Sequence, residues 1–258
     1  MSERLPAVFI AHSAPMLATD TVKGADYRRW AEALPRPEAV LMISAHWETR
    51  GPVHLGTTEP LPLLYDFYGF PAALYEVEYA APGAAQLATR VEQLLGAGAV
   101  TQEPQRPLDH GVWVPLLHMY PNADIPVLQM GLPRDRSPAQ LFELGRQLAP
   151  LRDEGVLIAG SGNLTHNLRD LDITDKAPPA PWARAFDQWL TERLEANDQD
   201  ALFDYRTAAP EATRAHPSDE HLTPLFVALG AAGGSQGVRF PITGFEYANL
   251  SRRCVEIA

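Results

Sequence analysis

The chain is poor in cysteine, in positive charge and in long apolar runs, and each shortage excludes a class of protein. Cys254 is the only cysteine among 258 residues, which rules out an internal disulfide and a Cys-x-x-Cys zinc ribbon. A formal net charge of −11 argues against a nucleic-acid partner, because such a surface repels phosphate groups. No apolar stretch approaches the roughly 18 residues needed to cross a bilayer. The N-terminal segment also lacks the apolar core of a signal peptide. We therefore expect a cytoplasmic protein without a membrane partner, either a monomer or a small homo-oligomer.

Short apolar runs alternate with helical patterns along the chain, which predicts an α/β fold. Strands are expected at 6–11, 39–45, 52–55, 125–130 and 155–160, and helices at 27–34, 84–95, 111–120, 137–148 and 182–194. Residues 240–257 predict two closing strands around Asn249, and the aromatic segment 61–71 predicts a loop. With no internal repeat, this pattern indicates a single catalytic domain over residues 1–258. It should contain a central mixed sheet with helices on both faces.

Two helix starts are marked by serine. Ser137 is expected to cap the helix that follows it, with Pro138 in the first position. Ser218 is expected to cap a helix that carries His221 in its first turn and runs to Ala232, where Gly233-Gly234 is the stop signal.

Four histidines stand in turns bordered by apolar residues or glycine, namely His12, His46, His166 and His221. An apolar run that ends in histidine predicts a buried strand that delivers an imidazole to its carboxyl end, where open α/β sheets bind ligands. For His12 or His46 alone, hydrogen bonding to the backbone would be a sufficient role. Several imidazoles at one edge instead make a site for zinc, iron or copper. We therefore expect a mononuclear metalloenzyme with its metal at the C-terminal edge of the strands.

Three histidines, one of them already named, leave more than one interpretation open. His166 follows a glycine-bracketed turn and could be a fourth ligand or a general acid/base. His110, beside Asp109, could donate a hydrogen bond to a substrate oxygen or be a core histidine. His216 precedes Pro217 and is expected to be extended. It could contact the substrate, support a ligand or lie in an exposed loop.

Carboxylates and serines add alternatives. Asp109, Glu48 and Asp66 lie in segments that carry these motifs, so a carboxylate ligand is possible. Either Glu48 or Glu220 could complete the two-histidine, one-carboxylate set that holds iron in many non-haem enzymes. Ser13 and Ser161 stand outside any G-x-S-x-G elbow, which argues against serine hydrolysis.

The histidines belong to six segments whose order and spacing resemble one known family. These segments are His12–Leu17, Ser44–Glu48, Leu64–Pro71, Asp109–Leu116, Gly160–Leu168 and His216–His221. Together they resemble the class III extradiol ring-cleaving dioxygenases, and most closely the DOPA extradiol dioxygenase-like branch of plants and bacteria. The resemblance extends to Gly244-Phe-Glu-Tyr247 and so covers nearly the whole chain. Where that family commonly has His-Gly-Ser-Pro, this chain has His12-Ser-Ala-Pro15, a change that bears on the turn and on the width of the pocket.

The resemblance implies extradiol cleavage of a catechol, DOPA or another small catechol, with incorporation of O₂. It implies one divalent metal, Fe(II) for activity, with Zn(II) often in its place. The matching metal ligands are His12, His46 and His221, the matching catalytic histidine is His166, and His110 lies near the substrate. The expected substrate contacts are His216, Asn163 and the aromatic wall of Tyr65, Phe67 and Tyr68, at least one of which we expect to be a core residue.

In this mechanism His166 is expected to take a proton from the catechol and to return it during O–O cleavage. His110 is expected to hydrogen-bond the developing oxyanion. Two other functions remain open. One is a zinc-dependent hydrolase, since three histidines and an activated water also make such a site. The other is a non-catalytic metal-binding protein on the same scaffold.

Overall fold

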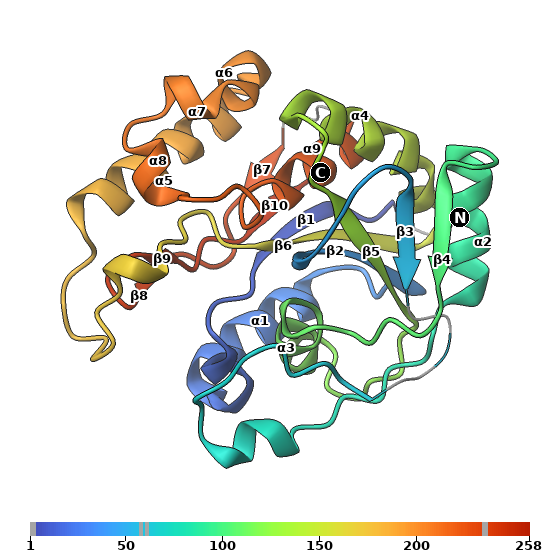
Figure 1. The fold of residues 1–258 in the computed structure, drawn as a ribbon, viewed down its shortest axis with the longest axis horizontal. Helices are drawn as coiled ribbons and strands as arrows, with labels where there is room; N and C mark the ends of the chain where they lie inside the picture. The colour runs from blue at the N-terminus through green and yellow to red at the C-terminus, as the bar shows by residue number, and fades with distance from the viewer. Residues whose placement is uncertain (1–3, 57–58, 60–61, 234–236) are drawn as a thin grey trace.

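The computed structural model describes residues 4–56, 59, 62–233 and 237–258 (Figure 1). The strands are β1 Ala7–Ala11, β2 Ala39–Thr49, β3 Val53–Gly56, β4 Val100–Glu103, β5 Val127–Pro133, β6 Val156–Gly162, β7 Val238–Arg239, β8 Phe245–Glu246, β9 Leu250–Ser251 and β10 Val255–Ile257. The α-helices are α1 Thr21–Ala33, α2 Ala85–Leu95, α3 His110–Met119, α4 Pro138–Leu148, α5 Pro181–Glu195, α6 Gln199–Phe203, α7 Tyr205–Ala208, α8 Ala212–Ala215 and α9 Pro224–Ala231. Short 3-10 helices are η1 Pro15–Thr19, η2 Ala72–Glu76, η3 Ala149–Glu154 and η4 Leu168–Asp170. Within these described ranges, every helix is too short or too polar to cross a membrane.

One large mixed sheet runs through the molecule in the order β4-β3-β5-β2-β6-β1-β10-β7. Its centre is parallel, because β2 pairs with both β5 and β6, and β6 pairs with β1. Antiparallel pairs flank this centre, β3 with β5 on one side and β10 with β1 and β7 on the other, while the edge strand β4 is parallel to β3. The strands β8 and β9 form a separate antiparallel hairpin. The expectation of an α/β fold with a central mixed sheet is confirmed.

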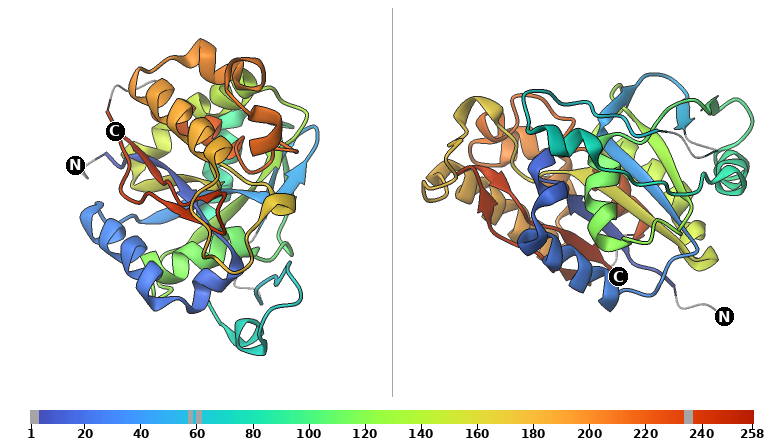
Figure 2. Two further views of the ribbon diagram at one scale, coloured as in Figure 1. Left: turned by 90° about the vertical axis from the view of Figure 1, so that its left-hand side faces the viewer. Right: turned by 90° about the horizontal axis from the view of Figure 1, so that it is seen from below.

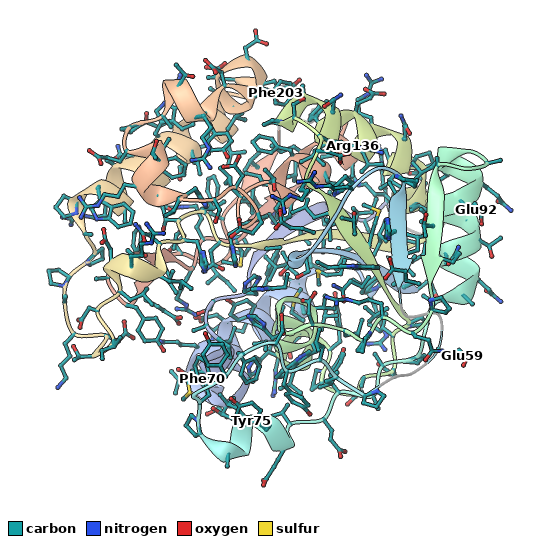
Figure 3. The ribbon with its side chains drawn as sticks, in the orientation of Figure 1. Glu59, Phe70, Tyr75, Glu92, Arg136 and Phe203 are labelled. Carbon is teal, nitrogen blue, oxygen red and sulfur yellow. The ribbon has the colours of Figure 1, made fainter. Side chains whose placement is uncertain are left out.

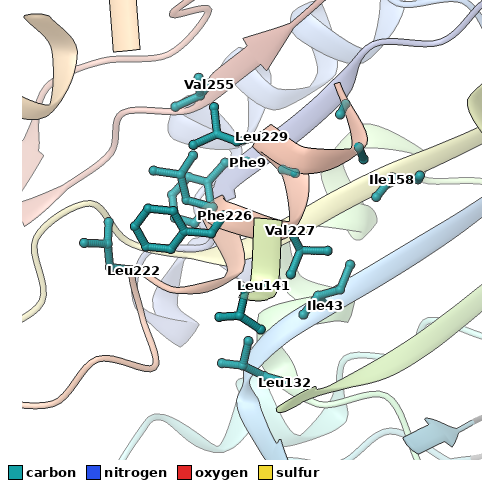
Figure 4. Close-up of a cluster of buried hydrophobic side chains, with 14 of the residues drawn as sticks. Phe9, Ile43, Leu132, Leu141, Ile158, Leu222, Phe226, Val227, Leu229 and Val255 are labelled. Carbon is teal, nitrogen blue, oxygen red and sulfur yellow. The ribbon is translucent and has the colours of Figure 1, made fainter. Parts of the chain in front are cut away.

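Helices cover both faces of this sheet (Figures 1 and 2). Side chains alternate along the central strands, so Phe9 of β1 faces one core and its neighbours Val8 and Ile10 face the other. The first core contains side chains of α2, α4, α5 and α9, including Leu141 and Phe226 (Figure 4). The second contains side chains of α1 and α3. Burial on both faces explains why these strands are continuous apolar runs instead of alternating ones.

Several boundaries differ from those expected from the sequence. Helix α1 begins at Thr21, because the Asp20 side chain caps it by accepting from the backbone of residues 22 and 23. Strand β2 continues past Ala45 to Thr49, so His46 lies within the strand and does not end it. Residues 240–257 hold three short strands, β8, β9 and β10, where two are expected.

The helix after His216 also begins later than the sequence predicts. Helix α9 begins at Pro224, and His221 lies in the turn before it instead of in its first helical turn. The Ser218 hydroxyl contacts Glu220 and caps no helix. Proline is favoured at the first position of a helix, which explains why α9 starts there. The helix ends at Ala231, and Gly234 of the expected stop signal lies outside the described residues.

The expected loop over 61–71 is confirmed from residue 62 onward, while Leu61 lies outside the described residues. It continues into η2, and Phe70 and Tyr75 lie along this segment at the edge of the molecule near α3 (Figure 3). Ser137 caps α4 as expected, and with Gln140 it forms a complete capping box. Pro138 occupies the first position of that helix.

Candidate metal centre

The carboxyl ends of β1, β2 and β6 meet at one edge of the sheet and carry the first two histidines. His12 directly follows β1, and its N–H donates to the Gly162 carbonyl at 3.0 Å. Strand β2 pairs with β6 as far as Ser44 opposite Ser161, and just beyond this point it shifts register against β5. His46 lies in that irregular stretch, so both imidazoles reach the same edge.

Hydrogen bonds define which nitrogen of His12 is free. The Ser161 hydroxyl donates to the Gly111 carbonyl at 2.5 Å, so its oxygen accepts from Nδ1 of His12 at 2.9 Å. The lone pair of His12 is therefore on Nε2, which lies 3.1 Å from Nε2 of His46. Zinc–imidazole bonds measure about 2.1 Å, so two nitrogens bound nearly at a right angle to one ion lie about 3 Å apart. The pair fits a shared ion.

His221 presents a third free nitrogen. Its Nδ1 lies 2.9 Å from Oε1 of Glu220, so the carboxylate accepts the ring N–H on that side. Its Nε2 is buried, and within the described residues no hydrogen bond reaches it. The ring centroid lies 5.3 Å from that of His12 and 5.0 Å from that of His46. A buried polar atom normally has a partner, so this nitrogen also fits an ion held between the three rings.

His110, the first residue of α3, offers a fourth nitrogen. Asp66 Oδ1 accepts from the His110 backbone N–H at 3.0 Å and from its Nδ1 at 2.8 Å, which leaves Nε2 free. The ring centroid lies 4.0 Å from that of His46. By distance alone, the group of ligand atoms within 4.8 Å of one another consists of His12, His46 and His110. This cluster of three histidines could hold a metal ion.

His166 stacks directly on His221. The two ring centroids are 3.4 Å apart and the ring planes differ by 9°. With Glu220 these rings form a second group of ligand atoms within 4.8 Å. The structure thus brings together in one cluster all five histidines that the sequence assigns to metal binding or catalysis. Beside His12 and His46, either His110 or His221 could supply a third ligand to an ion at this site.

Burial keeps the imidazoles of His12, His46, His166 and His221 neutral. It is the largest cause that lowers the pKa of His12 and of His221 well below 6.5, and the charges of the neighbouring histidines add to it. Burial, followed by repulsion from His110, lowers the pKa of His46 to about 3. Burial also lowers the pKa of His166 to about 4, although the charge of Glu220 opposes it. Neutral imidazole is the form that binds metals, so the donor set suits a divalent cation.

Asp66 is charged where it meets His110. Burial alone would raise the pKa of Asp66, but hydrogen bonds from His110 and its charge lower that pKa to about 2. Its other oxygen, Oδ2, lies 3.6 Å from Nδ1 of His46. One carboxylate therefore orients His110 and faces the outer nitrogen of a neighbouring ring.

A second carboxylate, Asp109, is buried beneath the cluster. Its Oδ1 accepts from the Ser44 hydroxyl at 2.7 Å, and its Oδ2 accepts from the Gln129 amide. Burial, followed by repulsion from Asp66, raises the pKa of Asp109. Gly111 lies beside Asp109 and leaves little room for a side chain. A Cβ there would lie 2.5 Å from Oγ of Ser44 and 3.0 Å from Cδ2 of His46.

The aromatic residues of the loop after β3 divide into three environments. Phe67 packs edge-on against His110, with ring centroids 5.6 Å apart and planes at 90°. Tyr65 donates its hydroxyl to the Val77 carbonyl at 2.6 Å and packs against Trp113. Tyr68 is 91% exposed. Phe67 therefore borders the cluster, while Tyr65 is tied into the loop and Tyr68 faces solvent.

The other two expected substrate contacts are buried. Asn163 follows β6, and its Oδ1 accepts from the Ser13 backbone at 3.2 Å, while its Nδ2 has no hydrogen-bond partner within the described part of the chain. His216 is fully buried, so it is not an exposed loop histidine. Its Nε2 donates to the Leu164 carbonyl at 2.9 Å, and its ring packs against Phe186.

Three residues orient histidines of the cluster by hydrogen-bonding their Nδ1 atoms, namely Asp66, Glu220 and Ser161. The sequence does not assign them this role, because it suggests Asp66 and Glu220 as possible direct ligands and argues against Ser161 as a nucleophile. The adjacency of Glu220 to His221 was an available signal, whereas Asp66 is 44 residues from His110. Glu48 lies elsewhere, half-exposed, with Arg134 at 3.7 Å.

Comparison with known proteins gives consistent matches over nearly the whole chain. Residues 6–253 match the family described as the catalytic LigB subunit of aromatic ring-opening dioxygenase. A Beta vulgaris protein named 4,5-DOPA dioxygenase extradiol is 45% identical over 87% of this chain and 86% of its own length. A protein of the same name from Escherichia coli K12 is 38% identical over 99% of this chain and 96% of its own. A crystal structure of an uncharacterized E. coli K12 protein superposes with a TM-score of 0.84 at 35% identity, covering 99% of this chain and 100% of that one.

Proposed function

Because the chain belongs to the family of catalytic LigB subunits of aromatic ring-opening dioxygenases, we propose that it opens the ring of DOPA or a related small catechol. The bond cut lies outside the two hydroxyl-bearing carbons, and O₂ is incorporated. The relatives named 4,5-DOPA dioxygenase extradiol support both the type of cleavage and the choice of substrate. The observation that carries the proposal is the convergence of buried imidazoles, with Nδ1 of His12, His110 and His221 each hydrogen-bonded on the side away from the cluster.

We propose that His12, His46 and His221 hold one divalent metal ion, Fe(II) for activity and Zn(II) in some preparations. The unpartnered Nε2 of His221 and the carboxylate behind its Nδ1 support this set, because carboxylate–histidine pairs orient metal ligands. When bound, Fe(II) supplies the electron transfer between catechol and O₂ and a positive charge that favours the ionised catechol. Loss of the ion on removal of His110 instead of His221 would reverse the choice of third ligand.

His166 acts as the general base and then as the general acid. Its pKa of about 4 leaves it neutral at pH 7, so a ring nitrogen is able to accept a proton from a catechol hydroxyl. The charge of Glu220 raises the pKa of His166 and so favours the imidazolium that results. The same proton is returned to oxygen when the O–O bond breaks.

His110 serves as the hydrogen-bond partner of the substrate oxygen. Asp66 accepts from both its backbone N–H and Nδ1, so the ring is held in one orientation with Nε2 toward the cluster. From this position Nε2 of His110 is placed to hydrogen-bond the developing oxyanion.

We propose that Phe67 walls the substrate pocket and that Nδ2 of Asn163 donates to the substrate. Phe67 borders His110, and the Asn163 amide is buried without another acceptor within the described residues. Tyr65 and His216 support the pocket from behind, since the Tyr65 hydroxyl and Nε2 of His216 already donate to backbone carbonyls.

We also propose a cytoplasmic location, with a small aromatic molecule and O₂ as the partners. The lone cysteine, which is buried, is compatible with a reducing compartment. The net charge of −11 disfavours nucleic acid. The protein is proposed to work as a monomer or a small homo-oligomer.

The test is oxygen uptake by protein reconstituted with Fe(II) without air and then given DOPA and a panel of catechols. Stoichiometric O₂ consumption with a new yellow product, absent with Zn(II), is the expected result. Turnover with Zn(II) in the absence of O₂ would instead indicate a hydrolase. Bound metal without any turnover would indicate a non-catalytic scaffold.

His166→Ala separates catalysis from metal binding. The variant should keep its metal and lose turnover, because the proton has no acceptor. His54→Gln is the matched control, since His54 pairs with Glu103 outside the cluster and should leave activity unchanged. If His166→Ala instead loses its metal, His166 is a ligand.

A further inference from the structure

The turn that follows His12 adopts a backbone conformation that residues with a side chain rarely take. Ser13 has a φ of 62°, in the left-handed region that favours glycine. Ser13 is also buried, with 6% of its surface exposed. A non-glycine residue stays in this region only where its surroundings hold it there. The contacts of Ser13 therefore determine how firmly the backbone beside His12 is fixed.

Two hydrogen bonds hold Ser13 in place. Its N–H donates to Oδ1 of Asn163 at 3.2 Å, and its hydroxyl donates to Oε2 of Glu246. The Asn163 backbone N–H in turn donates to the His221 carbonyl at 2.9 Å. The backbones of His12 and His221 are thus connected through Ser13 and Asn163.

Glu246 is itself fixed. Its side chain is only 4% exposed, and its Oε1 lies 2.9 Å from Nζ of Lys23 and 3.4 Å from Nε of Arg252. Lys23 lies in α1. Glu246 ends β8, and Arg252 directly follows β9, so both come from the β8–β9 hairpin region (Figure 1). A buried carboxylate with two cations is held firmly, because a buried charge that loses its partners is costly.

We propose that Ser13 and Glu246 are positioning residues for His12, and that the C-terminal hairpin thereby sets the geometry of the metal centre. The Ser13 hydroxyl bond to an ion-paired carboxylate holds the left-handed turn, and the turn holds the imidazole against Ser161. Hydrogen bonds to charged groups are the stronger kind. This inference rests on the proposed function only in assuming that His12 binds a metal.

The test compares Ser13→Ala, Glu246→Gln and the double variant with the wild-type protein. The readouts are Zn(II) affinity by competition with a chelator and the visible absorption spectrum of the Co(II)-loaded protein. Ser13→Ala keeps the unfavourable backbone and loses the bond, so its Zn(II) affinity should fall about 10-fold or more. When Glu246→Gln is already present, adding Ser13→Ala should lower the Zn(II) affinity clearly less than it does in the wild-type protein, because the charged Glu246 acceptor is already gone.

Ser137→Ala is the matched control, since the Ser137 hydroxyl caps α4 by accepting from the Gln140 backbone N–H. It should lower the unfolding temperature while Zn(II) affinity and the Co(II) spectrum stay at the wild-type values. If Ser13→Ala behaves in the same way as this control, the positioning role is refuted and Ser13 is merely structural.

A metal-free measurement separates this inference from the proposed function. The Nδ1 proton of His12, bonded to Ser161, should give a downfield NMR signal that moves in Ser13→Ala and in Glu246→Gln but not in Ser137→Ala. An unmoved signal overturns the inference even if the enzyme consumes O₂. A moved signal supports it even if no catechol is cleaved.

Discussion

Replacing Gly162 with alanine should weaken metal binding by displacing the backbone of His221. A Cβ at Gly162 would lie 2.0 Å from the His221 carbonyl oxygen, whereas ordinary contact begins at 3.4 Å. The difference is 1.4 Å. The atoms that the Cβ would meet belong to the His221 backbone, so no side chain is able to rotate out of the way. Metal–ligand distances tolerate only about 0.2 Å. Nε2 of His221 should therefore leave its position toward His12 and His46.

The size of the effect follows from the cost of overpacking. Adding a methyl group to a well-packed interior costs about 1–3 kcal/mol. If that strain falls on the metal-bound geometry, affinity decreases by about 5- to 150-fold. Gly145→Ala provides a control of equal steric severity, because its Cβ would lie 2.1 Å from the Val227 carbonyl oxygen, where α4 packs on α9. The atoms nearest to that Cβ belong to Val227 and Ala231, and none of them belongs to a histidine.

The assay measures Zn(II) affinity by chelator competition together with urea unfolding of the metal-free protein. Both variants should lose stability, but only Gly162→Ala should lose affinity. Equal affinity in Gly162→Ala and the wild-type protein would refute the reasoning, because the His221 backbone would then have no influence on the ion. Equal losses of affinity in both variants would show that general destabilisation is the cause.

Two further predictions concern Asp66 and His216. Asp66→Asn removes the charge that orients His110, so O₂ uptake should fall about 10- to 100-fold with the metal content unchanged. Metal loss in that variant, measured by elemental analysis, would instead identify His110 as a ligand. Burial is the main cause that lowers the pKa of His216 to about 3, so its contribution to stability is complete above pH 6.5 and is lost as the pH falls toward 3. In metal-free protein, His216→Gln should make the unfolding free energy less pH-dependent by about 1.4 kcal/mol per pH unit between pH 4 and 6, and an unchanged slope in urea titrations would contradict this.

The strands that carry His12 and His46 were predictable because they are buried on both faces. Such strands appear in the sequence as continuous apolar runs, and their carboxyl ends must lie at one edge of a parallel sheet. The apolar run did not reveal where β2 stops. Its last residues pair with β5 after a register shift, and such an irregularity depends on the neighbouring strand.

The choice of third ligand could not be made from spacing. His110 and His221 come from segments far apart in the chain, and both reach the same cluster because α3 and the turn before α9 lie at the same edge of the sheet. Their roles depend on what holds their outer nitrogens, Asp66 in one case and Glu220 in the other. The sequence places the start of this helix too early, because Ser218 is a residue type that favours helix caps, whereas Pro224 is the residue that begins α9.

The position of β1 has a consequence for how the protein is made. This strand, which delivers His12, pairs on one side with β6 and on the other with β10, where Val8 lies opposite Glu256. The second edge of β1 is therefore covered only when residues 255–257, which come much later in the chain, pair with it. Contacts between such distant segments form late, because a long loop must close first. Until that pairing forms, β1 should remain accessible to a protease or to an edge strand of another molecule.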